Sequence, residues 1–435
     1  MLISAAVVVD STHVTLETAT LNELLLVPDA PPAMTSTPLE ANVSTEGVDA
    51  FCGYTEECGT ARFLFVTIAS GIAVVGVFCN LLLVKIFFSK HCPNTPPTVF
   101  PLILAILDCH ICILYVLLFG VDVAMIYLKL ETLFVVYHAF IVPAFVLTKI
   151  CQLAIPYMLI FATMERYVWI STKKRKNCLF SAKGRRISAV LCLFLCFCLR
   201  IPTFWSLKVA EFELCHDFFR SLAVVPEEWA VESRVWEFYD FQLITFVQTF
   251  LPFLILVASN FVIVRRLAII QRANRCLQVH TVISETMRRR SWISQIPSIR
   301  RRKMSRPVRN AVYTMLVIVS SYLVCNSLHM ILTVLEKFDS DLLKTEDDPT
   351  KASIFYTVFG DTISCLYMFT STIRIVIYSK CNPAICQHLM TTLAKLVPGL
   401  RVEIARRNSR VAMPSSVRKR STLTVPAEAL SLRVL

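Results

Sequence analysis

Apolar residues gather along this chain into long uncharged blocks that are separated by short charged segments. Each block is about 20 residues long or longer, which is the length that a helix needs to cross a hydrocarbon core about 30 Å thick. Seven such blocks occur, at about 63–84, 98–120, 133–163, 187–206, 241–264, 311–335 and 352–378. The pattern predicts an all-α membrane protein in which residues 62–380 form a bundle of seven transmembrane helices.

The composition of the chain supports this prediction. Of the 435 residues, 55% are hydrophobic and 17% are charged, whereas about 25% are charged in ordinary soluble domains. This excess of apolar residues argues against a soluble enzyme, and we predict no enzymatic activity. Only 9 residues are glycine, which counts against transporters and pores built on glycine-interrupted helices.

Charged residues are distributed unevenly between the two sides of the predicted bundle. Residues 1–61 contain nine acids and no Lys or Arg, while segments 166–186 and 265–309 contain eight and thirteen basic residues. Because basic loops are retained in the cytoplasm, we predict a plasma-membrane protein with an extracellular segment 1–61 and a cytoplasmic tail 381–435. The basic residues lie in loops tied to the bilayer-spanning helices, without a recognition module, so nucleic acid is not an expected partner.

Cysteine is abundant, but most of the 17 Cys residues lie inside the predicted spans, where they act as small apolar side chains. The predicted outer segments hold Cys52, Cys58 and Cys215, which an oxidising compartment can join into disulfides. A metal site is suggested by the run Asp108-Cys109-His110-Ile111-Cys112, yet these side chains spread around a helix and no fourth ligand follows nearby. We therefore predict neither a metal site nor a cofactor.

Polar residues inside the spans carry most of the functional information, because an ionisable group in a bilayer is costly and usually faces the bundle interior. Asp108 in span two and Arg374 in span seven are predicted to form a charge pair, since an unpaired buried charge costs several kcal/mol. Asn80 and Asn326 are the other members of the predicted core polar network. The remaining polar residues of this kind are Lys149, Gln152 and His329.

Several short motifs occur in the order in which one receptor family carries them. They are Asn80, a Leu-Ala-x-x-x-Asp-like run at 104–108, Glu165-Arg166-Tyr167, Phe250-Leu251-Pro252 with Asn260, Cys325 and Tyr378. Over about residues 60–390 the chain resembles the rhodopsin-like family of G-protein-coupled receptors. Within that family, the segments Cys325-Asn326-Ser327-Leu328 with Glu336, and Ser371 to Tyr378 followed by Ser-Lys-Cys-Asn, are most similar to invertebrate FMRFamide-type neuropeptide receptors.

The resemblance implies that a ligand binds at the outer mouth, spans six and seven rearrange, and a cytoplasmic cleft opens for a heterotrimeric G protein. Arg166 is the expected G-protein contact, with Glu165 restraining it at rest. Tyr167 and Tyr378 complete the residues that the resemblance assigns to coupling and activation.

The chain departs from the family pattern at several positions. The family's cysteine at the outer end of span three is replaced by Ile141, so Cys215 is expected to pair with Cys52 or Cys58. The usual Trp and Pro of span six are Asn326 and Leu328. The positions that help Asp108 bind sodium in many members are Ile155 and Arg374, and we hypothesise that the Asp108–Arg374 ion pair replaces the sodium ion.

The predicted ligand is an extracellular peptide, specifically an amidated peptide ending in Arg-Phe. The amine-binding Asp of amine receptors is Thr148 here, and the Schiff-base Lys of opsins is Met368. The outer loops are acidic and would attract a cationic ligand. Candidate ligand-binding residues are Asp122, Glu336 and Asp361 at the mouth and Thr148, Gln152, Asn326 and His329 deeper in the bundle. The alternatives are a chemosensory or orphan receptor for a small molecule, and a membrane transporter.

Candidate modification sites lie outside the spans. The sequon Asn42-Val43-Ser44 makes Asn42 a candidate glycosylation site in the predicted extracellular segment. The tail begins with Asn382-Pro383 and continues as a predicted amphipathic helix over 384–396 lying on the lipid bilayer. Cys381 and Cys386 beside it are candidate palmitoylation sites.

Overall fold

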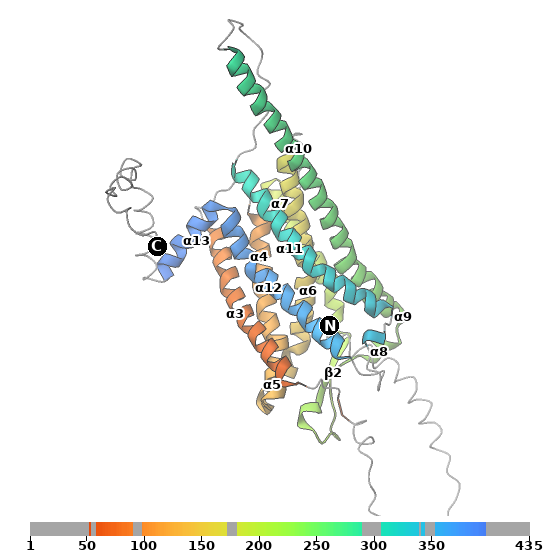
Figure 1. Cartoon of the computed structure of the whole chain (residues 1–435). Coiled ribbons are helices and arrows are strands. Elements are labelled where there is room, and N and C mark those ends of the chain that lie inside the picture. The colour runs from red at the N-terminus through yellow and green to blue at the C-terminus, as the bar shows by residue number, and fades with distance from the viewer. Residues whose placement is uncertain are drawn as a thin grey trace, which may run out of the picture.

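The structure is a computed structural model that describes residues 52–53, 58–89, 98–171, 181–288, 306–338, 341–343 and 353–396. Within these residues, seven helices are long and apolar enough to cross a membrane, so the predicted seven-helix bundle is confirmed (Figure 1). They are α3 (Thr60–Phe88), α4 (Val99–Tyr115) continued by α5 (Val121–Tyr127), α6 (Glu131–Ile170), α7 (Ala182–Arg200), α10 (Leu251–Arg288), α11 (Arg306–Lys337) and α12 (Ile354–Cys381). Asn42 and the tail beyond 396 lie outside the described residues.

The second helix runs past its predicted end at 120. A π-helical turn, Val116–Gly120, joins α4 to α5, and the helix ends at Tyr127. Gly120 lies within this helix and close to α3. A Cβ at this position would lie 2.6 Å from Ser70 Oγ, so a larger residue would require the Ser70 side chain to move.

The fifth helix is longer than its apolar block at both ends. It begins with α9 (Arg234–Glu237), continues through π-helical turns at Phe238–Ile244 and Phe246–Phe250, and becomes α10. Beyond the predicted end at 264 the chain has no Gly or Pro up to Arg288, so nothing in its propensities stops the helix when the apolar pattern ends. Figure 1 shows this extension of α10 projecting beyond the bundle.

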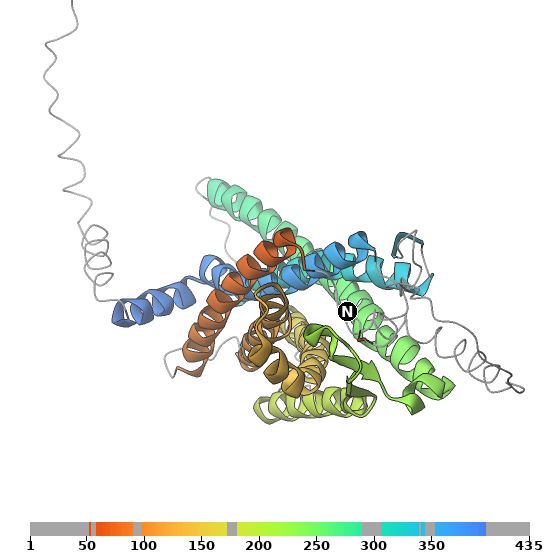
Figure 2. The same cartoon turned by 90° about the horizontal axis from the view of Figure 1, so that it is seen from below.

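Helix α6 is the central element of the bundle. It contacts α4, α7, α10 and α11, while α3 packs against α4 and α12 (Figure 2). The side chains that fill the space between these helices include Phe100, Leu153, Met158 and Ile318, all with 0% exposure. The outward faces are apolar as well, with Ile68, Phe78, Val190 and Phe194 exposed. An outer surface this apolar is expected for a protein that is surrounded by lipid.

A two-stranded hairpin covers one end of the bundle and was not predicted from the sequence. Strand β1 (Leu207–Glu211) pairs antiparallel with β2 (Leu222–Pro226) in a register that places Val209 opposite Val224. Between the strands, the Asp217 side chain accepts a hydrogen bond from the Phe219 amide at 3.0 Å and starts a short 3₁₀ turn, Phe218–Arg220. The Phe219 ring is buried against Phe134 of α6. We call this the hairpin end of the bundle.

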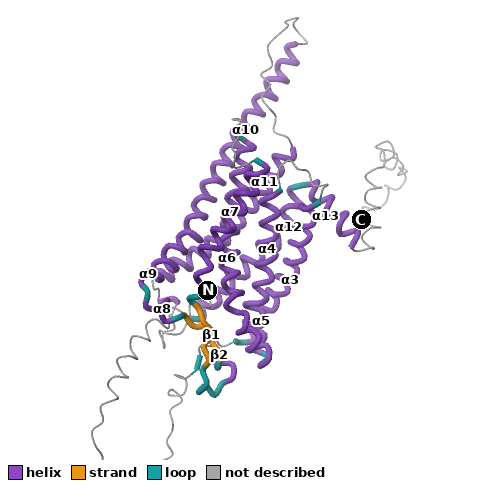
Figure 3. Tube along the Cα trace, turned by 180° about the vertical axis from the view of Figure 1, so that it is seen from behind, coloured by secondary structure: helices purple, strands orange, loops and turns teal. Residues whose placement is uncertain are grey.

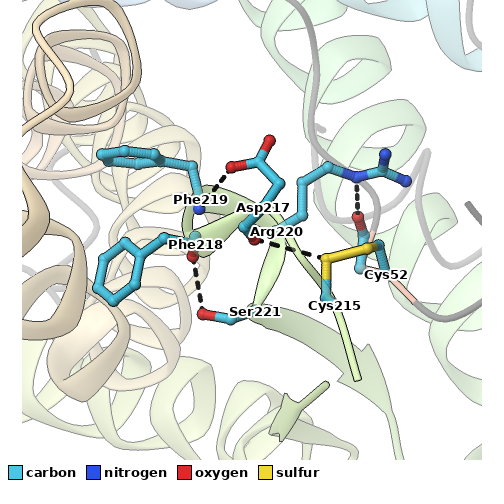
Figure 4. Close-up of a disulfide and its surroundings, with 8 residues drawn as sticks. Cys52, Cys215, Asp217, Phe218, Phe219, Arg220 and Ser221 are labelled. Atoms are coloured by element: carbon cyan, nitrogen blue, oxygen red, sulfur yellow. Dashed lines mark hydrogen bonds between the residues drawn. A yellow bond between two sulfur atoms is a disulfide. The ribbon is translucent and has the colours of Figure 1, made fainter. Parts of the chain in front are cut away.

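A disulfide between Cys52 and Cys215 joins the segment before α3 to this hairpin (Figure 4). Of the two partners that stayed open for Cys215, the structure therefore pairs it with Cys52. The backbones of Gly53 and Arg220 also bond, amide to carbonyl at 3.0 Å, and Arg220 Nε donates to the Gly53 carbonyl at 3.0 Å. A Cβ on Gly53 would lie 2.8 Å from Ala223 Cβ, so the hairpin and this segment approach each other closely.

The opposite end of the bundle carries helix α13 (Pro383–Leu396), which departs from the end of α12 (Figure 3). Asn382 begins this helix, because its side-chain oxygen accepts a hydrogen bond from the Ala384 amide at 3.2 Å. Ile385 and Leu389 are buried one turn apart, while Met390 is exposed. The predicted helix after Asn382-Pro383 is thus present, with one face packed inward, and Cys381 and Cys386 are half-buried beside it.

Candidate functional site

Among the described residues, three groups of buried polar side chains contain the residues predicted from the sequence, and the first is centred on Asp108. Arg374 of α12 forms an ion pair with Asp108 of α4 through Nη1 and Oδ2. The second carboxylate oxygen of Asp108 accepts a hydrogen bond from Ser371 Oγ at 2.9 Å. Asn80 of α3 donates to the Ser371 carbonyl at 3.2 Å. All four residues are at most 3% exposed, so α3, α4 and α12 are held together by one buried polar network.

This geometry confirms the predicted Asp108–Arg374 pair but divides the predicted core network. Asn80, Asp108 and Arg374 lie together, joined by Ser371. Asn326 bonds instead to Tyr322 and Tyr367 in the second group. The difference arises because Asn326 lies nearer the hairpin end, where α12 presents Tyr367 rather than Arg374.

The second group lies between α6, α11 and α12 toward the hairpin end. Asn326 Oδ1 accepts hydrogen bonds from the hydroxyls of Tyr322, at 3.5 Å, and Tyr367. His329, one turn further along α11, places its ring edge-on to Tyr367 with centroids 6.1 Å apart. From α6, Lys149 lies over the Phe145 ring, 4.9 Å from its centroid, and is an electrostatic neighbour of His329.

Two atoms of this group are buried without a hydrogen-bond partner. They are Asn326 Nδ2 and His329 Nδ1. Asn326 is only 1% exposed. A buried polar atom left unpaired costs about 1–3 kcal/mol.

Of the other residues predicted to bind a ligand in the interior, both lie on α6. The Thr148 hydroxyl donates a hydrogen bond to the Ala144 carbonyl at 2.9 Å, so its hydrogen is used within its own helix. Gln152 is half-buried one turn further along. Thr148 and Gln152 flank Lys149 on this helix.

The predicted acids at the mouth are engaged by protein partners. Asp361 is 4% exposed and forms an ion pair with Arg62 of α3, whose Nε donates a hydrogen bond to the carboxylate at 3.0 Å. Glu336 accepts a hydrogen bond from the Tyr356 hydroxyl at 2.8 Å. Asp122 lies half-buried on α5 as an electrostatic neighbour of Tyr137. Two of the three acids therefore tie helices together at the hairpin end.

The third group lies where α6 ends, near α13. The carboxylate of Glu165 is 3.8 Å from Arg166 Nη1 and 3.4 Å from Arg185 Nη1 of α7. Glu165 is 0% and Arg166 3% exposed. Tyr378 is buried edge-on to Phe87 and is an electrostatic neighbour of Arg166, Arg374 and Asp108. The predicted residues Glu165, Arg166 and Tyr378 thus meet in one buried cluster.

Tyr167 lies apart from this cluster although it follows Arg166 directly. Its ring packs against a hydrophobic group that includes Ile170, Ile263 and Val312. Successive helical residues point about 100° apart, so Tyr167 faces α10 and α11 while Arg166 faces the interior. The contact ties α6 to the two helices beside it.

Several buried charged residues were not predicted from the sequence. Arg200 at the end of α7 is 6% exposed, lies 3.2 Å from Asp240 Oδ1, and donates through Nε to Gln248 Oε1 at 3.1 Å. Arg62 and Arg185 were missed too. Arg200 was detectable, because it is a cation inside the predicted span 187–206, but no pattern in the sequence indicated its partners.

Within the ranges that the structure describes, no group of three or more His, Cys, Asp or Glu side chains could hold a metal ion. In the run at 108–112, Cys112 is buried against α3 and α12, while His110 is exposed and bonds through Nδ1 to the Ile106 carbonyl at 2.8 Å. The three groups offer ion pairs and hydrogen bonds in the middle of the bundle and toward its two ends.

The chain was compared with models of known protein families and with curated proteins. No family model matches it, and no curated protein matches it.

Proposed function

We propose that this multi-pass membrane protein is a G-protein-coupled receptor of the rhodopsin-like type, resident in the plasma membrane. Its ligand is an extracellular neuropeptide, specifically an amidated peptide ending in Arg-Phe, and its partner inside the cell is a heterotrimeric G protein. The hairpin end faces outward in this proposal, because the acidic segment 1–61 precedes α3 and the basic loops lie at the other end.

The observation that carries the proposal is the buried Glu165–Arg166–Arg185 cluster at the end that bears α13. Charged side chains at a helix end reach water at little cost, yet these are held inside by mutual attraction across α6 and α7. Opening the bundle at this end would separate Glu165 of α6 from Arg185 of α7 and expose Arg166. Such an arrangement supports a closed resting state of the bundle. A cytoplasmic partner would bind and stabilise the open state.

The Asp108–Arg374 network supports the same mechanism from the middle of the bundle. Tyr378 is an electrostatic neighbour of both this pair and Arg166. A ligand that moves α12 at the hairpin end would therefore disturb a continuous polar path toward Arg166. The path runs along α12, from Tyr367 through Ser371 and Arg374 to Tyr378.

The test is a calcium and cyclic-nucleotide response in cells that express the chain and receive a library of amidated neuropeptides. We expect a response that Arg166→Ala abolishes at equal surface expression. The matched control is Arg186→Ala, which removes an exposed arginine at the same end of the bundle and should leave the response intact. Loss of signal in both variants, or in neither, would contradict the proposed role of Arg166.

A receptor for a small environmental molecule is the second candidate. One observation favours it: Asp361 and Glu336, which would receive the peptide arginine, already have Arg62 and Tyr356 as partners. Silence toward every peptide, together with a response to small chemosensory compounds that Arg166→Ala abolishes, would select this candidate. Uptake of a labelled solute that is unaffected by Arg166→Ala would select a transporter instead.

A further inference from the structure

The turn between β1 and β2 has two attachments. On one side, the disulfide joins Cys215 to Cys52. On the other side, the rings of Phe218 and Phe219 point away from the disulfide (Figure 4) and pack against Phe134 of α6, with ring centroids 5.5 and 5.4 Å from that of Phe134. The two attachments therefore join the hairpin to different parts of the chain.

The disulfide does not fix the hairpin to a transmembrane helix. Cys52 lies in the segment before α3, which begins at Thr60. The Gly53 amide donates to the Arg220 carbonyl at 3.0 Å, so this segment is bound to the hairpin by its backbone as well. In the family pattern the partner cysteine would lie on the third span, at the position of Ile141. Because the disulfide here ends outside the helices, the hairpin and the Cys52 segment can move as one unit.

Contact between the turn and α6 depends on side-chain packing. The Phe219 ring is 8% exposed and contacts Phe134, and the Lys129 ammonium lies 4.7 Å from the centroid of the same ring. Lys129 has a φ of 53°, in the left-handed region that is uncommon for residues other than glycine. We call Phe134, Phe219 and Lys129 the latch. Its contacts are noncovalent, so they can break and re-form while the disulfide stays intact.

The two faces of the hairpin report separately on its two attachments. Val209 of β1 and Val224 of β2 are cross-strand partners, and both pack against the core of the bundle. Ala223 points to the other face, because side chains alternate along a strand. It is 9% exposed and lies against Gly53, where a Cβ would be 2.8 Å from Ala223 Cβ. Release from α6 would expose Val224 and leave Ala223 covered.

We infer that the β1–β2 hairpin is a lid that opens from α6 at the latch and moves together with the Cys52 segment. No covalent bond is made or broken in this movement. The closed lid covers the hairpin end of α6, and the open lid exposes that end and the inner face of the hairpin to water. The inference goes beyond the proposed function, because it holds for any solute that enters the bundle from the hairpin end.

The experiment measures how fast a water-soluble maleimide labels a cysteine on each face of the hairpin, in the full chain purified in detergent micelles. The reporters are Val224→Cys and, in a separate chain, Ala223→Cys. Residues 221–234 contain no native cysteine, so mass spectrometry of this peptide isolates the reporter. Phe219→Ala should speed labelling of the Val224→Cys chain about tenfold or more, because it removes a buried ring. The Ala223→Cys chain should stay slow.

Lys129 provides a graded test of the latch. Lys129→Gln should speed labelling of the Val224→Cys chain about two- to fivefold, which is the weight of a cation–π contact at an exposed site. Lys129→Arg keeps the cation and should keep the original rate. Leu214→Ala, at a residue 72% exposed in the same turn, is the matched control and should leave both reporters unchanged.

Two results of the Phe219→Ala experiment would overturn the lid. One is an unchanged labelling rate of the Val224→Cys chain. The other is equal acceleration of both reporters, because the hairpin would then unfold rather than open. Neither result depends on a ligand or a G protein, so the lid and the receptor proposal fail independently.

The role of the disulfide is tested in the double variant Cys52→Ser/Cys215→Ser. The latch remains in this variant, so the Val224→Cys chain should be labelled more slowly than it is with Phe219→Ala. Equal or faster labelling would show that the disulfide, and not the latch, keeps the hairpin closed, and would overturn the inference.

Discussion

The Asp108–Arg374 ion pair offers the sharpest test of how this bundle is held together. The two side chains are 1% and 3% exposed, and Asp108 also accepts a hydrogen bond from Ser371 at 2.9 Å. We consider the variants Asp108→Asn and Arg374→Gln, singly and combined. Each single change leaves one buried charge without its partner, and the double change leaves a neutral pair of similar shape.

The expected magnitudes follow from what each variant leaves behind. Breaking a buried pair costs about 3–5 kcal/mol. Asp108→Asn should lie at the upper end of this range, because the guanidinium of Arg374 stays charged in every condition. Arg374→Gln should lie at the lower end, because the abandoned carboxyl can take up a proton and keeps Ser371. The double variant should lie within about 2 kcal/mol of the wild type, since neutral replacements of buried pairs are often tolerated.

The measurement is unfolding of the purified protein in mixed micelles titrated with dodecyl sulfate, followed by intrinsic fluorescence. The interaction energy between the two sites is the double change minus the sum of the single changes. We expect a magnitude of at least about 6 kcal/mol, from single losses of about 5 and 3 kcal/mol and a combined loss of at most about 2 kcal/mol. Lys85→Gln removes an exposed charge on α3 and should change the free energy of unfolding by less than about 0.5 kcal/mol.

Additive losses, with an interaction energy below about 1 kcal/mol, would refute the reasoning that the pair exists and is desolvated.

A second result tests the hypothesis that the ion pair replaces a sodium ion. Because Arg374 already neutralises Asp108, replacing sodium chloride by choline chloride should leave the unfolding midpoint of the wild type unchanged. Strong stabilisation by sodium would show that the cation binds there in spite of Arg374.

Three further changes test other contacts. Gly76→Val should destabilise the bundle by about 1–3 kcal/mol, because even a Cβ would lie 2.4 Å from the nearest atom of α12. The control is Gly71→Ala, where a Cβ meets nothing within 4 Å. It should be neutral or slightly stabilising in the same unfolding assay. Asp361→Asn should lower stability by about 1–3 kcal/mol because it breaks the ion pair with Arg62. Exchanging the two residues should recover most of the loss, and unchanged stability in Asp361→Asn would contradict their pairing. Peptide mapping without reductant should recover the peptide of Cys52 linked to the hairpin, and dithiothreitol should release it; a linkage to another cysteine would contradict the structure.

The helical framework could be read from the amino-acid sequence because the bilayer allows few solutions. A segment that crosses hydrocarbon must satisfy its own backbone, so each apolar block of sufficient length becomes a helix. The blocks located all seven helices, although α5 and the extension of α10 continue beyond them. The Asp108–Arg374 pair was predictable for the same reason, since two opposite charges in apolar spans have no better partner than each other.

The partners of most other polar side chains were decided only by the tertiary structure. Asp361 looked like a free acid at the mouth until the fold placed Arg62 of α3, some 300 residues away, beside it. The choice of Cys52 for Cys215 depended on the hairpin, which has no transmembrane constraint and left no clear pattern.

The same division applies to the candidate ligand site. That Asn326 and His329 face the interior followed from their place in an apolar span. Which of their atoms stay unpaired depended on two tyrosine hydroxyls, one on the same helix and one on α12. Hydropathy specifies which residues enter the bilayer because burial depends on composition averaged over many residues. Hydrogen bonds depend on the positions of single atoms, and only the packing of the helices determines those.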